Sequence, residues 1–140
     1  MLRAKALSRL CRTLVLATLT LPFATAATAA DRVYELRTYT AAEGKLEALH
    51  RRFRDHTLEL FEKHGMTVVG FWVPASGDTA ANTLVYLLSF PSEQARNQAW
   101  KAFGEDPEWK RVSEESQRDG RMLEKVESVM LAPTDYSPLR

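Results

Sequence analysis

Three polar side chains at alternate positions, Glu35, Arg37 and Tyr39, are the strongest candidates for chemistry in this sequence. Alternate residues of a strand project to one face, so a carboxylate, a guanidinium and a phenol would lie side by side. Such a group could line a ligand pocket, with Glu35 as a base and Arg37 stabilising an oxyanion. A cross-strand ion pair beside a half-buried tyrosine accounts for the same residues without a function.

Three histidines form the second candidate group. His50, His56 and His64 are six and eight positions apart, whereas two metal ligands on one helical face need a spacing of three or four. No metal site is therefore expected. At about 100° per residue of an α-helix, all three lie toward the apolar side of one helix, where His56 could act as a proton shuttle or ligand. In the alternative interpretation they are border residues, and His64 neutralises the helix C-terminus.

Motifs of common enzyme classes are missing from the sequence. It has no G-x-S-x-G nucleophile elbow, no phosphate-binding glycine loop and no H-E-x-x-H. The basic residues Arg51, Arg52 and Arg54 could suggest a phosphate surface, but acidic residues alternate with them between positions 47 and 62. This mixture is typical of a solvent-exposed helix face, and the three tryptophans are interpreted as packing residues.

The first thirty residues differ in kind from the rest. Four basic residues and no acid occur before position 13, and residues 13–30 carry no charge. The apolar run 13–23, followed by small residues at alternate positions, predicts a secretory signal peptide over residues 1–30. We expect a domain over residues 31–140 that is exported to the periplasm. The alternatives are a mitochondrial transit peptide and an uncleaved leader that anchors the chain in a membrane.

The predicted cleavage changes the charge of the protein. The chain has 140 residues, 19 basic and 18 acidic, with a net charge of +1; without residues 1–30 it keeps 15 basic residues and a net charge of −3. Neither value suggests nucleic-acid binding. The only cysteine, Cys11, lies in the leader, so thiol chemistry and disulfides are not expected in the exported domain. We expect no cofactor, and no membrane contact after cleavage.

The hydrophobic pattern predicts one domain with the order β-α-β-β-α-β. Alternation predicts a strand over 33–39, and a 3.6-residue period predicts a helix from about 45 to Lys63, ended by Gly65. Ser92 is expected to cap a helix reaching Phe103, and Asp106 another piece ending near Gly120. The remaining strands are expected over 66–74, 83–90 and 123–131. The order predicts an α+β, ferredoxin-like antiparallel sheet with helices on one face.

The two middle strands are apolar on both faces, which a sheet with helices on one face does not require. We therefore expect a second copy to cover the other face, giving a face-to-face homodimer. With Leu36 turned toward the helices, Glu35, Arg37 and Tyr39 would face the dimer interior, near Trp72 or Tyr86.

Several short motifs span residues 34–138: YELRTY at 34–39, GK at 44–45, HG at 64–65, GFW at 70–72, DPEW at 106–109, VESV at 126–129 and PTDYSP at 133–138. Together they resemble those of the NIPSNAP family, a branch of the dimeric α/β-barrel superfamily. The resemblance implies the ferredoxin-like fold and the face-to-face dimer, and the leader resembles those of exported bacterial members. Superfamily relatives include cofactor-free monooxygenases, lactone isomerases and haem-handling enzymes, but their catalytic residues match no motif in this sequence.

We therefore expect an exported homodimer that binds a small, partly apolar organic molecule in a pocket between sheet and helices. If the protein is an enzyme, proton transfer with His56 or Glu35 as base and Arg37 at an oxyanion is the simplest chemistry. The alternatives are a non-catalytic binding or assembly module with a solid dimer core and, more weakly, a haem-binding protein. The residues expected to line the pocket are Glu35, Arg37, Tyr39, His56, Trp72 and Tyr86.

Overall fold

A computed structural model describes residues 32–139 of the chain, and the predicted signal peptide lies outside them. The second element is one helix interrupted by a π-helical segment, η2. The elements in order are β1 (Val33–Ala41), α1 (Leu46–Arg52), η2 (Phe53–Thr57), α2 (Leu58–Lys63), β2 (Thr67–Trp72), β3 (Thr83–Phe90), α3 (Glu93–Glu105), α4 (Pro107–Ser116) and β4 (Leu123–Leu131).

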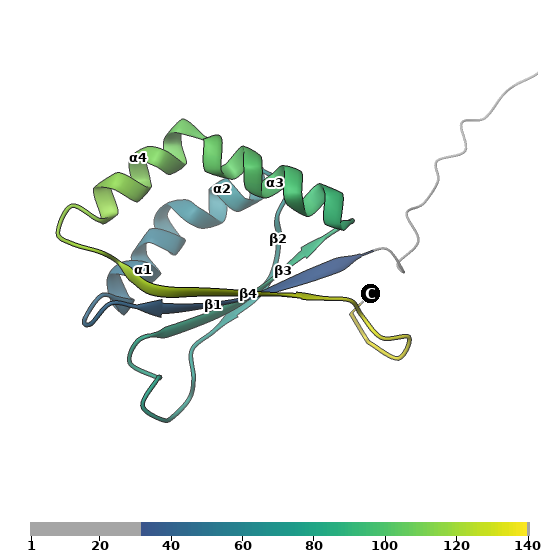
Figure 1. Cartoon of the computed structure of the whole chain (residues 1–140), viewed down its shortest axis with the longest axis horizontal. Coiled ribbons are helices and arrows are strands. Elements are labelled where there is room, and N and C mark those ends of the chain that lie inside the picture. The colour runs from purple at the N-terminus through teal and green to yellow at the C-terminus, as the bar shows by residue number, and fades with distance from the viewer. Residues whose placement is uncertain (1–31, 140) are drawn as a thin grey trace, which may run out of the picture.

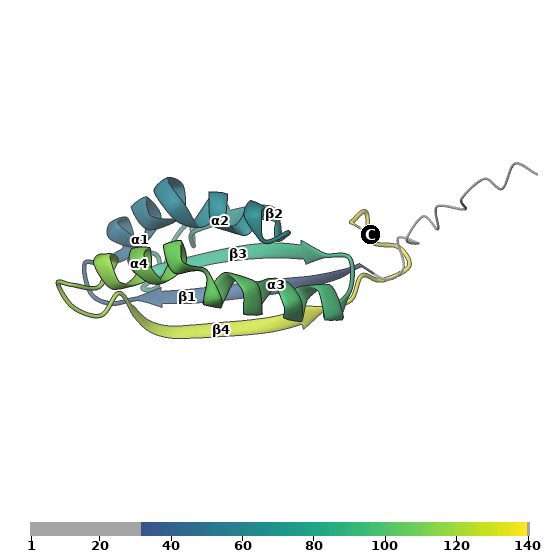
Figure 2. The same cartoon turned by 90° about the horizontal axis from the view of Figure 1, so that it is seen from above.

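The four strands form one antiparallel sheet in the order β2-β3-β1-β4. All helices lie on one face of this sheet, α1 and α2 along one side and α3 and α4 along the other (Figures 1 and 2). This is the α+β, ferredoxin-like arrangement predicted from the order of the elements. Among residues 32–139, no helix is long and apolar enough to cross a membrane.

Local signals in the sequence set the helix boundaries. Ser92 Oγ accepts a hydrogen bond from the backbone N–H of Ala95 at 3.1 Å, and α3 begins there. Asp106 Oδ1 accepts from the N–H of Glu108 at 2.8 Å at the start of α4. Gly65 adopts a φ of 72° directly after α2, a conformation that favours glycine. The predicted caps and the predicted stop are confirmed.

The π-helical segment η2 aligns the buried face of the long helix. Every fourth residue is buried, from Leu49 through Phe53 and Thr57 to Phe61. In a regular α-helix each step of four residues rotates the side chain by about 40°, and the wider π turn cancels part of this drift. The segment also turns His56 toward the border with α4, as in the interpretation of His56 as a border residue.

The condition considered for the sheet, with Leu36 turned toward the helices, does not hold. Glu35, Arg37 and Tyr39 face the helices, whereas Leu36 lies on the other side. Tyr39 joins the aromatic core and Glu35 reaches donors on α3, contacts that the opposite face does not offer. Both faces of the strands are apolar, so their period of two did not distinguish the core side from the other.

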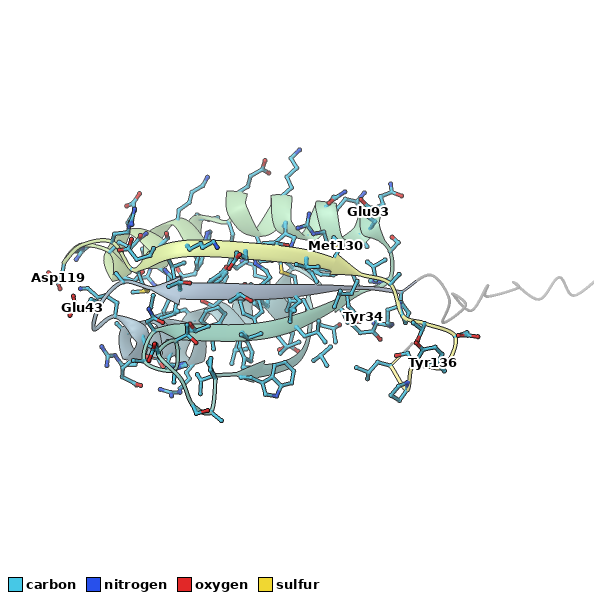
Figure 3. The ribbon with its side chains drawn as sticks, turned by 60° about the horizontal axis from the view of Figure 1, so that its bottom comes forward. Tyr34, Glu43, Glu93, Asp119, Met130 and Tyr136 are labelled. Atoms are coloured by element: carbon cyan, nitrogen blue, oxygen red, sulfur yellow. The ribbon has the colours of Figure 1, made fainter. Side chains whose placement is uncertain are left out.

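The other side, here called the open sheet face, carries Tyr34, Leu36, Val85, Leu87 and Val129, and none of the helices between residues 32 and 139 lies over it (Figure 1). Figure 3 looks toward this side of the molecule, with Tyr34 near one end of the sheet and Tyr136 on the C-terminal tail beyond it. The tail after β4 forms an apolar space of about 290 Å³ with Tyr34 and Leu87. The tail covers only the end of the open sheet face near Tyr34, and Val129 remains 51% exposed.

Candidate functional site

Glu35 is fully buried, and its carboxylate accepts five hydrogen bonds. Oε1 accepts from Arg37 Nη1 at 2.9 Å, from Arg96 Nη2 at 2.7 Å and from Ser128 Oγ at 2.6 Å. Oε2 accepts from Arg96 Nε at 2.8 Å and from Trp100 Nε1 at 2.6 Å. Glu35 and these four donors, from β1, α3 and β4, are called the Glu35 network below.

The Glu35 network fixes the ionisation of its central carboxylate. Burial alone raises the pKa of Glu35, but the hydrogen bonds from Arg96, Ser128, Trp100 and Arg37 outweigh it and lower the pKa to about 2. Glu35 is therefore a carboxylate at neutral pH whose lone pairs are already occupied. This arrangement suits an anchor that positions Arg37 better than a base that accepts a proton from a substrate.

Two tyrosines extend this network toward the helices. Arg37 Nη2 donates to Tyr39 Oη at 3.3 Å, and Tyr86 Oη donates to the same oxygen at 2.9 Å. Burial raises the pKa of Tyr86 well above its usual value, so Tyr86 stays a neutral donor. Because Tyr39 Oη accepts from both neighbours, its own proton is left to donate to another group.

A cavity of about 250 Å³ lies between the sheet and the helices beside Tyr39. This inner cavity is smaller than the roughly 300–1,000 Å³ typical of sites for drug-sized ligands, so it suits a molecule of about one ring. Most of its wall is aromatic. Its lining residues are Arg37, Tyr39, Arg52, Phe53, Thr57, Phe61, Trp100, Phe103, Gly104 and Trp109.

Arg52 is the second cation on the wall of the inner cavity. It is 7% exposed, its guanidinium carbon lies 5.2 Å from the ring centre of Trp109, and Nη1 donates to Ser116 Oγ at 3.3 Å. Burial lowers the pKa of Arg52. Its buried Nε has no hydrogen-bond partner within residues 32–139, and the same holds for Nε of Arg37. Both arginines therefore keep an unmet donor.

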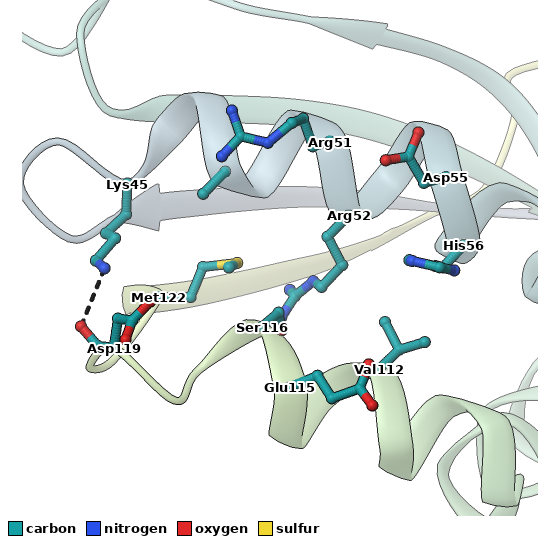
Figure 4. Close-up of a pocket in the computed structure, with 11 residues that line it drawn as sticks. Lys45, Arg51, Arg52, Asp55, His56, Val112, Glu115, Ser116, Asp119 and Met122 are labelled. Carbon is teal, nitrogen blue, oxygen red and sulfur yellow. Dashed lines mark hydrogen bonds between the residues drawn. The ribbon is translucent and has the colours of Figure 1, made fainter.

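Arg52 also borders a second space on the outside of the helices. This outer depression of about 400 Å³ is lined by residues of both charges, among them Lys45, Asp55 and Glu115. Figure 4 shows the Arg52 side chain crossing from α1 toward Ser116 on α4. Arg52 thus separates the inner cavity from the outer depression.

The structure brings four of the six predicted pocket residues together and leaves two elsewhere. Glu35, Arg37, Tyr39 and Tyr86 form one chain of hydrogen bonds, and Arg37 and Tyr39 line the inner cavity. Trp72 lies at the open sheet face, paired with Val85 and 52% exposed. It is separated from the other residues by the sheet itself.

The histidines do not line the inner cavity. His56 is half-buried and borders the outer depression and a smaller space beside Lys63 and Glu108. His64 Nε2 lies 2.7 Å from Asp106 Oδ2, and Lys63 Nζ lies 2.7 Å from the same oxygen. These contacts link the end of α2 to the start of α4. Hydrogen bonds from Lys63 and His64 hold the pKa of Asp106 well below its usual value. Within residues 32–139, no group of three or more His, Cys, Asp or Glu side chains is arranged to hold a metal ion.

Arg52, Arg96 and Ser128 belong to the site but were not predicted from the sequence. Arg52 was expected on a solvent-exposed face but is buried, although its place three residues after Leu49 puts it at the border of the apolar side. Arg96 lies one helical turn before Trp100, on the side of α3 that faces the sheet, and this spacing could have identified it. Ser128 is opposite Arg37 across the β1–β4 ladder, and nothing in its local sequence indicates this pairing.

Comparison with known proteins places the chain among related domains. The NIPSNAP family model matches residues 34–138. A NIPSNAP family protein of unknown function from Agrobacterium tumefaciens has a solved structure that is 26% identical, with a TM-score of 0.67, covering 79% of this chain and 96% of that one. The structure of an uncharacterised NIPSNAP domain protein from Burkholderia xenovorans is 24% identical, with a TM-score of 0.65, covering 76% of this chain and 98% of that one.

One structural relative carries a described activity. SnoaB, a cofactor-independent oxygenase from Streptomyces nogalater, is 16% identical with a TM-score of 0.54, covering 78% of this chain and 99% of that one. At this identity the likeness concerns the fold alone. No curated protein sequence matches the chain.

Proposed function

The chain belongs to the NIPSNAP family, and we propose that it binds a small, partly apolar organic molecule in the inner cavity between sheet and helices. The observation that carries this proposal is the wall of the cavity, where the guanidinium groups of Arg37 and Arg52 stand among six aromatic side chains. The terminal nitrogens of such a group can donate to an oxygen-bearing ligand, and aromatic walls would hold its apolar part.

Binding explains the interior better than a solid-core assembly module does. A module of that kind gains nothing from a space that keeps two arginines next to aromatic rings. The haem-binding alternative has less support, because none of the ten residues that line the inner cavity is a histidine. If the protein turns over its ligand, Tyr39 can donate a proton to it. Glu35 is poorly placed to act as a base, because five hydrogen bonds occupy its oxygens.

We further propose that two copies associate through the open sheet face. The open sheet face presents a continuous apolar surface across three strands, and no helix in the described part of the chain lies over it; its side chains are those of Leu36, Val85, Leu87 and Val129. A sheet covered on one side only is expected to carry polar residues on the other. A second copy related by a two-fold axis would present the same surface and bury both.

The binding proposal is tested by identifying what accompanies the protein. The chain is purified under native conditions, and small molecules released on denaturation are identified by mass spectrometry. Because Trp100 and Trp109 line the inner cavity, rebinding of a candidate should change tryptophan fluorescence. A Phe103→Ala variant removes part of the wall and enlarges the cavity, so it should change the affinity for the ligand. Failure of every co-purified molecule and every small aromatic probe to bind at millimolar concentration would overturn the proposal.

A further inference from the structure

The charges around the inner cavity do not balance. Glu35 forms ion pairs with both Arg37, at 2.9 Å, and Arg96, at 2.7 Å. Arg52 forms no ion pair with any residue between 32 and 139, although it is nearly as buried as the aromatic core around it. A buried charge without a counter-charge is costly, so an uncompensated guanidinium on a cavity wall indicates a site for an anion.

The geometry of Arg52 fits this role. Its guanidinium stacks on Trp109, and its one hydrogen bond within residues 32–139, from Nη1 to Ser116, is long at 3.3 Å. A guanidinium offers donors in a planar fork that matches the two oxygens of a carboxylate. The Arg37 guanidinium already donates to Glu35 and Tyr39, so fewer of its N–H groups are left for a ligand.

Acidic residues of the chain do not supply the counter-charge. The outer depression, on the far side of Arg52 from the inner cavity, is bordered by Asp55, Glu115 and Asp119. Glu115 is itself paired with Arg111 at 2.6 Å. Within residues 32–139 the guanidinium of Arg52 therefore has no carboxylate partner, and a bound anion would supply the counter-charge.

The rest of the cavity indicates what carries the anion. Phe53, Phe61 and Phe103 give the wall flat aromatic surfaces, and the volume of about 250 Å³ suits one ring with a short substituent. The free proton of Tyr39 can reach a second oxygen on such a ring.

We propose that the ligand of the inner cavity is a small aromatic carboxylate, and that Arg52 determines this specificity by pairing with the carboxylate. The inference rests on the proposed binding function and adds the chemical class of the ligand. It assigns the roles as follows: Arg52 binds the anion, the aromatic walls hold the ring, and the Glu35 network keeps Arg37 and Tyr39 in place.

The test compares charged and neutral probes of the same shape. Benzoate, salicylate and phenylacetate are titrated against the purified full chain, each beside its amide, with calorimetry or tryptophan fluorescence as the readout. We expect each carboxylate to bind at least about tenfold more tightly than its amide, as a charge-assisted hydrogen-bond pair requires. Arg52→Met keeps an unbranched side chain beside Trp109 and should abolish this preference, so that each carboxylate binds about as weakly as its amide.

Two controls keep the result interpretable. Arg54→Met removes an exposed arginine that pairs with Glu47, on the same helix, and should change nothing. Arg52→Lys keeps the charge without the fork and should retain part of the preference; it also serves if Arg52→Met does not fold, as judged by circular dichroism. Equal affinity for carboxylates and amides in the unmodified protein would overturn the inference and leave the proposed function standing. Absence of binding by both classes would overturn the two together.

Discussion

The guanidinium carbon of Arg37 lies 4.4 Å from the ring centre of Trp100, and both side chains donate to Glu35. β1 and α3 are therefore joined at one point, by the stacking of these two side chains and by their shared acceptor, Glu35. A cation held over an aromatic face and tied to a carboxylate has little freedom to reorient. This explains how β1 can present a charged side chain to a cavity and keep it in one position.

Glu35→Gln should destabilise the fold by about 3 kcal/mol, because it leaves the buried guanidinium of Arg37 and the partly buried one of Arg96 without a counter-charge. Ser128→Ala removes one of the five hydrogen bonds and should cost only about 1 kcal/mol. Urea unfolding of both variants checks the order. A loss for Glu35→Gln no larger than that for Ser128→Ala would contradict the central role of the carboxylate.

Stability should fall in acid, in part through Glu35. Its pKa drops from 4.5 to about 2 on folding, so its contribution is fully present above about pH 4.5 and is lost as the pH falls toward 2. Asp106, whose pKa is also lowered, acts in the same direction. The difference in unfolding free energy between the unmodified protein and Glu35→Gln should therefore shrink over this range, and a constant difference would disprove the assignment.

Val129→Lys should weaken the proposed dimer by more than about tenfold, because a two-fold axis would bury the new charge twice. Val126→Lys is a matched control on the same strand: Val126 is 45% exposed and lies opposite Tyr39 on the helix side, whereas Val129 is 51% exposed and lies opposite Leu36. Light scattering at micromolar concentration measures the effect. Equal behaviour of the two variants, or a monomeric unmodified protein, would count against the open sheet face as the interface.

Gly104 lines the inner cavity, and a Cβ added to it would meet no atom within 4 Å. Gly104→Ala should therefore stabilise α3, by about 0.5–1 kcal/mol. Gly104→Leu should keep that stability but narrow the cavity and weaken the binding of aromatic probes several-fold. Thermal unfolding and probe titration separate the two effects, and unchanged affinity in Gly104→Leu would mean that the ligand does not use this part of the wall.

Export is proposed from the charge and hydropathy of residues 1–30. The protein isolated from its own cells should begin between Ala27 and Asp31, because the small-x-small sites end there. N-terminal sequencing together with cell fractionation checks both the cleavage and the periplasmic location. Recovery of the chain with Met1 intact in the membrane fraction would favour the uncleaved alternative.

The order of elements, the caps and the stop could be predicted from the sequence because they depend on local chemistry. Ser92 and Asp106 accept from the N–H groups two or three residues onward, and Gly65 adopts its positive φ without a distant partner. The predicted bounds of β3 and β4 match the structure, and those of β1 and β2 differ from it by one or two residues. Short-range patterns of this kind are complete within a few positions of the chain.

The assembly of the site depends on contacts between distant segments, and these were not predictable in the same way. Ser128 and Glu35 are 93 positions apart and meet only because β4 pairs with β1. The choice of face for Glu35 rests on donors from α3, which alternation along the strand does not contain. The burial of Arg52 depends on how α4 packs, and its position within a basic cluster suggested the opposite.

The π-helical segment Phe53–Thr57 makes the site sensitive to chain length at one point. It holds one residue more than a regular helix would need to cover the same turn, and this extra residue brings Phe53, Thr57 and Phe61 into line along the cavity. A relative that lacks one residue here would keep the sheet and the helices but would rotate α2 against the cavity wall. In an alignment of the family, we expect a single gap at this position to mark relatives whose inner cavity has a different shape.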